Sequence, residues 1–124
     1  MTVSRGEAYW IDLPEADDDD QTVTGSEQAE QRPGIVVQND SENNELNTTI
    51  ILPTTTGSRE EARCCLSMIF ISSDKECLTQ DSIALCNQLR VVDVDKRFLD
   101  CIGEISPKKM REIEKGLQVV LDLY

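Results

Sequence analysis

Two residues of types suited to phosphoryl chemistry stand at the ends of expected strands, Arg32 and Thr55. Pro33 follows Arg32 and biases it toward extended backbone at the start of an apolar run. A guanidinium can hold two phosphate oxygens, and a threonine hydroxyl can donate one further hydrogen bond. Taken alone, an arginine at a strand start is usually a solvated surface residue, and Thr55 lies in a β-branched run that strand propensity already explains. Both interpretations stay open at this point.

The chain has 124 residues and no histidine. Without imidazole, acid–base and nucleophile-activating roles fall to carboxylates, Lys, Arg, Tyr or hydroxyls. The net charge of −12 normally opposes a nucleic-acid partner, because polyanions repel one another and phosphate binding depends on Lys and Arg. A nucleic-acid partner therefore requires a locally positive groove, for which Arg32, Arg90 and Arg5 are the candidates.

Cysteines and acidic residues offer no clear metal site. Five cysteines form no C-x-x-C pair, and Cys64 and Cys65 are adjacent, which indicates reduced thiols rather than a disulfide framework or a four-cysteine zinc site. The run Asp17 to Asp20 lacks the spaced ligands and the glycine turn of a calcium loop, so a solvated charge run is favoured. With no phosphate-binding glycine motif, nucleophile elbow or dinucleotide fingerprint in the sequence, we expect neither metal nor cofactor.

The length and the 39% of hydrophobic residues fit one domain over residues 1–124. No stretch approaches the roughly 18 apolar residues of a membrane span. The N-terminus also lacks the basic and then apolar pattern of a signal peptide. We therefore expect a cytoplasmic protein with no membrane partner.

Hydrophobic patterning predicts a mainly β fold. Residues 14–31 hold seven acidic and no basic side chains, which predicts a flexible acidic loop, and residues 41–47 are expected to form a polar turn. Short strands in series favour a small antiparallel barrel. Strands are predicted over residues 5–13, 35–40, 48–57, 64–72 and 82–93.

The last third of the chain changes to helical spacing. Asp95 is predicted to cap a short helix over residues 96–102 that ends at Gly103. Ser106 and Pro107 then predict the N-cap and first turn of a C-terminal helix. The expected core face of that helix comprises Met110, Ile113, Leu117, Val120 and Leu121.

Five segments in this order resemble the MazF/PemK family of type II toxin endoribonucleases: RGEAYWIDL, GSEQ, RPGIVVQND, TTIILPTT and DSIALCNQLR. The resemblance covers almost the whole chain. It implies an SH3-like small antiparallel barrel with a C-terminal helix, assembled as a homodimer that binds single-stranded RNA in a groove near the dimer interface. It also implies a cognate antitoxin whose disordered tail competes with RNA.

The resemblance places the catalytic residues on Arg32 and Thr55, and RNA-binding residues on Ser26, Gln88 and Arg90. The reaction it implies is metal-independent and sequence-selective: a ribose 2′-hydroxyl attacks the adjacent phosphate and leaves a 2′,3′-cyclic phosphate and a 5′-hydroxyl. A guanidinium keeps its proton under ordinary conditions, so we expect Arg32 to stabilise charge. Proton transfer by Arg32 is the alternative.

Two departures from the family pattern concern the loop over 14–31, which is longer and more acidic, and the segment SREEARCCLSMI, which aligns with nothing in the family. We hypothesise that Asp17 to Asp20 cover the groove as an anionic lid. Two rival functions are a barrel-class toxin that poisons DNA gyrase, as CcdB does, and an inactive member that binds its antitoxin without cutting. The amphipathic C-terminal helix argues against the first, and the presence of Arg32 and Thr55 argues against the second.

Overall fold

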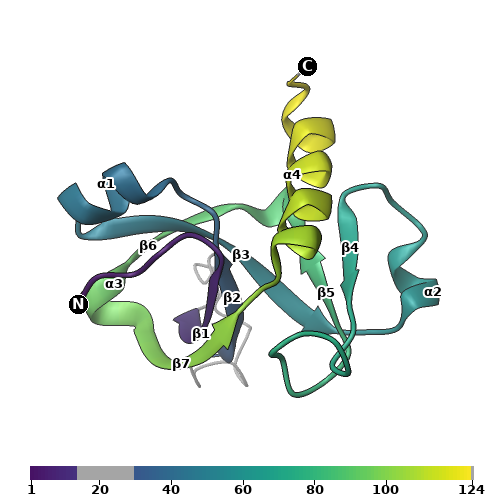
Figure 1. The fold of residues 1–124 in the computed structure, drawn as a ribbon, viewed down its shortest axis with the longest axis horizontal. Coiled ribbons are helices and arrows are strands. Elements are labelled where there is room, and N and C mark those ends of the chain that lie inside the picture. Colours follow the sequence, from purple (N-terminus) through teal and green to yellow (C-terminus); the bar gives the residue numbers. More distant parts are fainter. Residues whose placement is uncertain (14–29, 124) are drawn as a thin grey trace, which may run out of the picture.

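The computed structural model describes residues 1–13 and 30–123, and Figure 1 shows a twisted sheet with a helix standing over one part of it. Short helices connect several of the strands. The elements in chain order are β1 (Glu7–Leu13), β2 (Glu30–Val36), α1 (Asp40–Glu45), β3 (Thr48–Thr56), α2 (Arg59–Ala62), β4 (Met68–Ile71), β5 (Ser82–Leu85), the 3₁₀ helix η2 (Cys86–Gln88), β6 (Arg90–Asp93), α3 (Val94–Arg97), β7 (Phe98–Glu104) and α4 (Pro107–Leu121).

The sheet is antiparallel throughout, with the strand order β4-β5-β3-β2-β1-β7 and with β6 also paired to β3. The expected fold class, mainly antiparallel β with a C-terminal helix, is confirmed. Barrel closure is not detected within the described ranges, where no pairing joins the outer strands β4 and β7.

Strand β3 is the centre of the sheet because it pairs with three other strands. Along one edge, Gly34 to Val36 of β2 pair with its middle residues. Along the other edge, the first half of β3 pairs with β6, and Thr54 to Thr56 then pair with β5. One strand thus links the two parts of the sheet.

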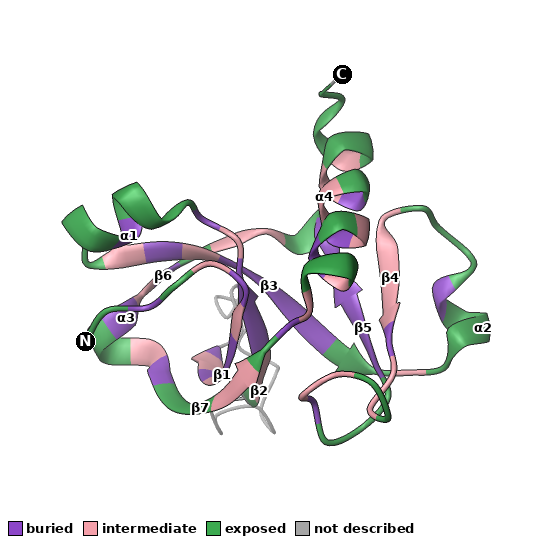
Figure 2. Ribbon diagram, viewed as in Figure 1, coloured by how far each residue is buried: buried purple, intermediate pink, exposed green. Residues whose placement is uncertain are grey.

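Apolar side chains on β1, β2 and β3 form the core beneath this arrangement, as the buried segments in Figure 2 show. Ile11, Ile35, Ile51 and Leu52 are fully buried. Burying each such side chain contributes about 1.5–3 kcal/mol to folding. These strands are therefore rigid supports for whatever residues stand at their ends.

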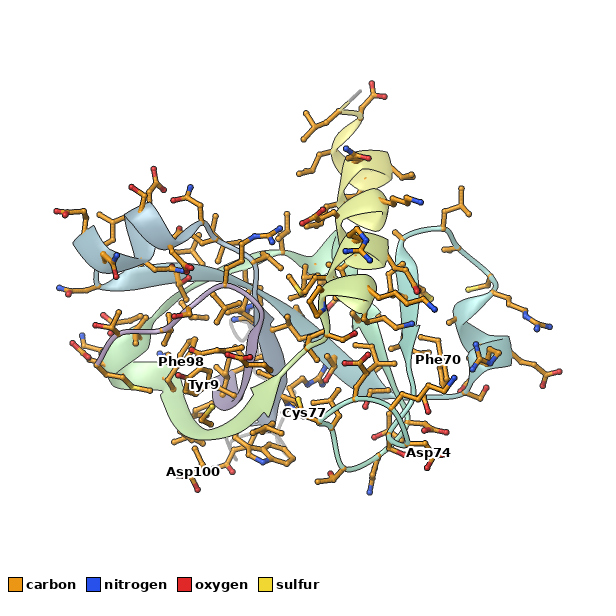
Figure 3. All side chains as sticks on the ribbon, viewed as in Figure 1. Tyr9, Phe70, Asp74, Cys77, Phe98 and Asp100 are labelled. Carbon is orange, nitrogen blue, oxygen red and sulfur yellow. The ribbon has the colours of Figure 1, made fainter. Side chains whose placement is uncertain are left out.

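The joint between β1 and β7 is fixed by an aromatic pair. The rings of Tyr9 and Phe98 lie 4.9 Å apart between centroids and are tilted by 53°. Figure 3 shows the two side chains next to each other between these strands. Such tilted pairs add about 0.5–1.5 kcal/mol beyond the area they bury.

Helix α4 begins as the sequence predicts, since the Ser106 hydroxyl accepts a hydrogen bond from the Lys109 backbone N–H and Pro107 occupies the first turn. Met110 and Ile113 are buried against the sheet, whereas Leu121 at the far end is 47% exposed. The expected core face therefore covers the first turns and becomes exposed toward the last. In the part of the chain that the structure describes, no helix is long and apolar enough to cross a membrane.

The predicted helix over residues 96–102 is wrong. Only Val94–Arg97 is helical, and Asp93, rather than Asp95, caps it by accepting from the Lys96 backbone N–H. Phe98–Glu104 is the strand β7, which pairs with β1. The burial of Phe98 against Tyr9 outweighs the local helical pattern, since tertiary context overrides propensity.

Other boundaries also differ from the sequence-based expectation. The expected turn over 41–47 contains the helix α1, whose N-cap Asn39 accepts from the Glu42 backbone N–H. Strand β2 begins at Glu30, inside the expected loop over 14–31, and the strand expected over 64–72 is limited to Met68–Ile71. The strand expected over 82–93 is interrupted by η2. The limits of β2 and β4 follow from strand pairing, since Glu30 pairs with Leu13 and Met68 pairs with Leu85.

Candidate active site

A cleft of about 300 Å³ lies at the first half of β2 and the end of β3, and both Arg32 and Thr55 line it. The loop before β5 forms its other wall. The residues that line it are Trp10, Gln31, Arg32, Pro33, Thr54, Thr55, Thr56, Leu78, Thr79, Gln80 and Ser82.

The pairing of β2 with β3 brings the strand segments that carry the two candidate residues side by side. Gly34 pairs with Pro53, and the Thr54 hydroxyl donates a 2.9 Å hydrogen bond to the Pro33 carbonyl. Arg32 and Thr55 lie just beyond this paired segment, and both line the cleft. The geometry therefore allows both side chains to contact one phosphate group.

Gly34 leaves room beside the cleft for the side chain of a neighbouring strand. A Cβ atom at this position would lie 2.6 Å from Cδ1 of Ile11 on β1, which is closer than side-chain contacts allow. The glycine thus permits the fully buried Ile11 to pack across β2. In the Arg32-Pro33-Gly34 sequence, the arginine supplies a guanidinium to the cleft. The glycine leaves the space that β2 needs to pack between β1 and β3.

The rim on the β5 side is held by its own hydrogen bonds. The Thr56 hydroxyl donates to Oε1 of Gln80 at 3.1 Å. Asp81 accepts from both the backbone N–H and the hydroxyl of Ser73, at 2.9 and 3.0 Å. These two hydrogen bonds hold the pKa of the Asp81 carboxyl below its ordinary value, and the bond from the Ser73 backbone N–H has the larger effect. The rim is thereby fixed while its carboxylate stays ionised.

The chemistry of the cleft follows from which groups remain accessible. Arg32 is half-buried and is the one charged side chain among the described lining residues. Thr55 is exposed, and its hydroxyl makes no hydrogen bond to another described residue, so it can donate to a ligand. Across the described ranges, no group of three or more His, Cys, Asp or Glu side chains could hold a metal ion. The cleft can therefore hold an anion through one guanidinium and one hydroxyl.

Of the other predicted site residues, Gln88 and Arg90 do not line this cleft. Ser26 and the run Asp17 to Asp20, to which the lid hypothesis refers, lie outside the described residues. Gln88 is exposed at the end of η2. Arg90 begins β6 and lines a separate cleft of about 350 Å³. The residues that line that second cleft are Asp12, Leu13, Arg90, Val91, Val92, Asp93, Lys96 and Arg97.

Among the lining residues that were not singled out from the sequence are Trp10, Gln80 and Ser82. Trp10 pairs with Pro33 across the β1–β2 ladder, next to Arg32. Its signal was the position of the chain's single tryptophan in the strand expected over residues 5–13. Gln80 and Ser82 come from a loop and the strand that follows it, and only the pairing of β5 with β3 brings them to the cleft.

Comparison with known families identifies the class of protein. The model of the PemK-like, MazF-like toxins of type II toxin–antitoxin systems matches residues 4–121. The chain belongs to this family, as its sequence motifs predict. It is more specifically a homologue of the MazF endoribonucleases: it is 32% identical to endoribonuclease MazF2 of Mycobacterium bovis over 99% of this chain and 100% of that protein.

Solved structures of low sequence identity share the fold. An endoribonuclease from a mycobacterial species, solved in complex with its cognate antitoxin, superposes with a TM-score of 0.75 at 19% identity and covers 98% of this chain and 97% of its own. MazF from Deinococcus radiodurans gives a TM-score of 0.69 at 15% identity, with 99% of each chain covered. The arrangement of the strands around α4 is therefore the MazF-like fold.

Proposed function

We propose that this endoribonuclease cleaves single-stranded RNA at selected sequences without a metal ion. In the proposed reaction a ribose 2′-hydroxyl attacks the adjacent phosphorus and the bond to the 5′-oxygen breaks. The products are a 2′,3′-cyclic phosphate and a 5′-hydroxyl. The observation that carries this proposal is the meeting of Arg32 and Thr55 in one cleft.

Arg32 is proposed to stabilise the charge that develops on the phosphorane. Its fork-shaped guanidinium can donate to two non-bridging oxygens at once. The Thr55 hydroxyl can donate one more hydrogen bond to the same group. Removing one such donor from a preorganised site typically slows a reaction by about 10²–10³. Because a guanidinium holds its proton tightly, the charge-stabilising role is favoured over proton transfer.

The polar and aromatic lining is proposed to bind the bases next to the cut. Proteins bind single-stranded RNA by stacking bases on aromatic rings and by hydrogen bonds to base edges. Trp10 is half-buried beside Arg32 and offers a ring, and Gln80 and Ser82 offer polar groups. These side chains are the candidates for sequence selectivity, together with the predicted contacts of Ser26, Gln88 and Arg90.

The net charge of −12 limits how RNA can bind. Long-range attraction is weak for such a protein, so affinity must come from contacts inside the clefts. Arg32 supplies a cation in one cleft, and the second cleft adds Arg90, Lys96 and Arg97. RNA that follows both clefts would meet the positive side chains and avoid much of the acidic surface.

We also propose that the protein acts in the cytoplasm as a homodimer and is inhibited by a cognate antitoxin. The family is defined by type II toxin–antitoxin systems. A mycobacterial relative of the same fold was solved with its cognate antitoxin, and MazF of Deinococcus radiodurans was solved with MazE.

The test is cleavage of a long RNA in EDTA by the wild-type protein and by Arg32→Ala and Thr55→Val variants. We expect wild-type cleavage that leaves ends which polynucleotide kinase labels without prior phosphatase treatment. Both variants should cut slowly while melting at the wild-type temperature. Matched controls are Arg111→Ala, an exposed arginine on α4, and Thr48→Val at the other end of β3; both should cut normally.

Each proposed element has an outcome that contradicts it. Folded wild-type protein that cuts only when a divalent ion is added would contradict the metal-independent reaction. Folded protein that never cuts and still binds its antitoxin would support the inactive-member alternative. Cutting that survives both the Arg32 and the Thr55 substitution would remove the site assignment.

A further inference from the structure

The Cys64 thiol, just after α2, has two other sulfur atoms near it, those of Cys65 and of Met68 at the start of β4, and none of the three residues lines the cleft. Sγ of Cys64 lies 3.8 Å from Sγ of Cys65 and 3.6 Å from Sδ of Met68. Both cysteines are exposed and unoxidised, and Met68 is half-buried. The two thiols are therefore accessible, whereas the thioether is held by its surroundings.

The spacing of these sulfurs suits a single metal ion. Metal–sulfur bonds to cysteine are about 2.3 Å long in zinc sites, which is a representative value for a first-row ion. Ligands at that distance lie about 3.8 Å apart in tetrahedral geometry and about 4.0 Å apart in trigonal geometry. The two measured separations, 3.8 and 3.6 Å, are close to these values. The Cys64 thiol thus lies at ligand spacing from both other sulfurs, and rotation of the exposed Cys65 side chain can complete the set of three around one ion.

A disulfide is the competing fate of two neighbouring thiols, and backbone geometry disfavours it. Adjacent Cα atoms lie about 3.8 Å apart across a trans peptide. Relaxed disulfides join Cα atoms about 4.4–6.8 Å apart, so a bridge between Cys64 and Cys65 would be strained and easily reduced. The dithiol form is thus the stable one in a reducing environment, and it is the form that a metal requires.

Both ends of the segment are anchored. Helix α2 begins with a capping box in which Ser58 and Glu61 exchange hydrogen bonds. Met68 opens β4, pairs with Leu85 and packs against the buried cluster that includes Ala62. A site whose supports are fixed before the ligand arrives loses less entropy on binding.

We propose that Cys64, Cys65 and Met68 form a binding site for one Cu(I) ion. Soft thiolate and thioether ligands select Cu(I) over harder ions. Zinc, by contrast, takes nitrogen, oxygen and thiolate ligands in sets of four. On binding, each of the two thiols releases its proton to solvent, and the complex of two thiolates, one thioether and Cu(I) carries one negative charge. No change of oxidation state is involved.

The site is tested with the full chain, under anaerobic conditions and with a phosphine reductant, by titrating Cu(I) against a competing chromogenic chelator. Native mass spectrometry then gives the stoichiometry. We expect one Cu(I) per chain, and we expect Cys64→Ser and Cys65→Ser to lose it. Met68→Leu should bind at least about tenfold more weakly. Cys101→Ser, which removes another exposed cysteine, is the matched control and should bind as the wild type does.

Several results would overturn the proposal. One is wild-type protein that binds no Cu(I) at equimolar ratio, and another is binding that survives either Cys64→Ser or Cys65→Ser. Unchanged Cu(I) affinity in Met68→Leu would show that Met68 is not a ligand. Zinc binding of equal affinity would show that the site does not select Cu(I). A Cys64–Cys65 disulfide that forms fully in a glutathione buffer would replace metal binding by oxidation. Melting curves of each variant show that loss of binding is not loss of folding.

Discussion

The two ends of β3 carry similar polar side chains but use them differently. Near its start, Thr49 is fully buried and belongs to a hydrogen-bonded cluster with Gln38 and Asn43. At its end, Thr55 is exposed in the cleft, and its hydroxyl bonds to no described residue. Buried polar groups that are hydrogen-bonded stabilise the fold. An exposed polar group on the same rigid strand is available to bind a ligand.

The side-chain amide of Asn43 makes most of the hydrogen bonds in the buried cluster at the start of β3. Oδ1 of Asn43 accepts from Nε2 of Gln38 at 2.9 Å and from the Thr49 hydroxyl at 2.7 Å. Nδ2 of Asn43 donates to the Gln38 carbonyl at 2.9 Å and to Oδ1 of Asp40 at 3.1 Å. Both atoms of the amide are therefore in use, and removal of this one side chain leaves several buried groups without partners.

The largest effect on activity is expected at the open end. Arg32→Ala should slow cleavage by about 10²–10³, because the developing phosphoryl charge loses its cation. The free energy of unfolding should change by less than about 0.5 kcal/mol, since the arginine is not part of the core. Single-turnover cleavage and urea unfolding measure the two quantities. Arg32→Lys should recover only part of the rate, since lysine lacks the planar fork.

The largest effect on stability is expected at the closed end. Asn43→Leu should lower the free energy of unfolding by about 2–4 kcal/mol, because Gln38 and Thr49 keep buried groups without partners. Urea unfolding measures this, and Asn44→Leu at the exposed neighbouring position is the control. Cleavage per folded molecule should stay at the wild-type rate. A large fall in that rate would show that the two ends of β3 are coupled.

A substitution between the two ends should affect both properties. Thr54→Val removes the 2.9 Å bond that ties β3 to the Pro33 carbonyl, at a cost of about 1 kcal/mol in unfolding free energy. Because this bond sets the spacing of the strands beside Arg32, cleavage should also slow, though less than in Arg32→Ala. A stability loss with no change in rate would mean that the other strand pairings hold the cleft without this bond.

The smallest expected effects concern acid. Asp81 beside the cleft and Asp40 beside the buried cluster both have a pKa held below the ordinary value, chiefly by backbone N–H groups of Ser73 and Arg5. A carboxyl whose pKa is lowered by folding contributes stability above its ordinary pKa, and this is lost as pH falls through the folded value. Asp81→Asn and Asp40→Asn should each flatten the fall of melting temperature below pH 4. Unchanged profiles would mean that these bonds persist in the unfolded chain.

Local patterns predicted the parts of this molecule whose signals lie close together in the sequence. The Ser106-Pro107 start of α4 and the apolar runs of β1 and β3 are of this kind. Strand β7 was predicted as a helix because its determinant is distant: Phe98 packs against Tyr9 across the sheet.

The same distinction applies to the candidate site. Arg32 was marked by the proline that follows it, and Thr55 by the family motif. Gln80 has no local signal, since only the pairing of β3 with β5 brings its loop to the cleft. Arg90, by contrast, stands on β6 opposite Ile51, in the middle of β3, and therefore lines a different cleft.

The position of Thr55 on the central strand has a consequence for how such an enzyme can be silenced. Strand β3 pairs with β2, β5 and β6, and Thr55 itself pairs with Ile83 of β5, so melting of this strand as a whole would disrupt most of the sheet. Local unfolding of β3 is therefore not a way to inhibit the enzyme. An inhibitor must block the cleft or compete with the substrate that binds there. Release of that inhibitor would restore a site that never lost its shape, and activity would return as fast as the inhibitor dissociates.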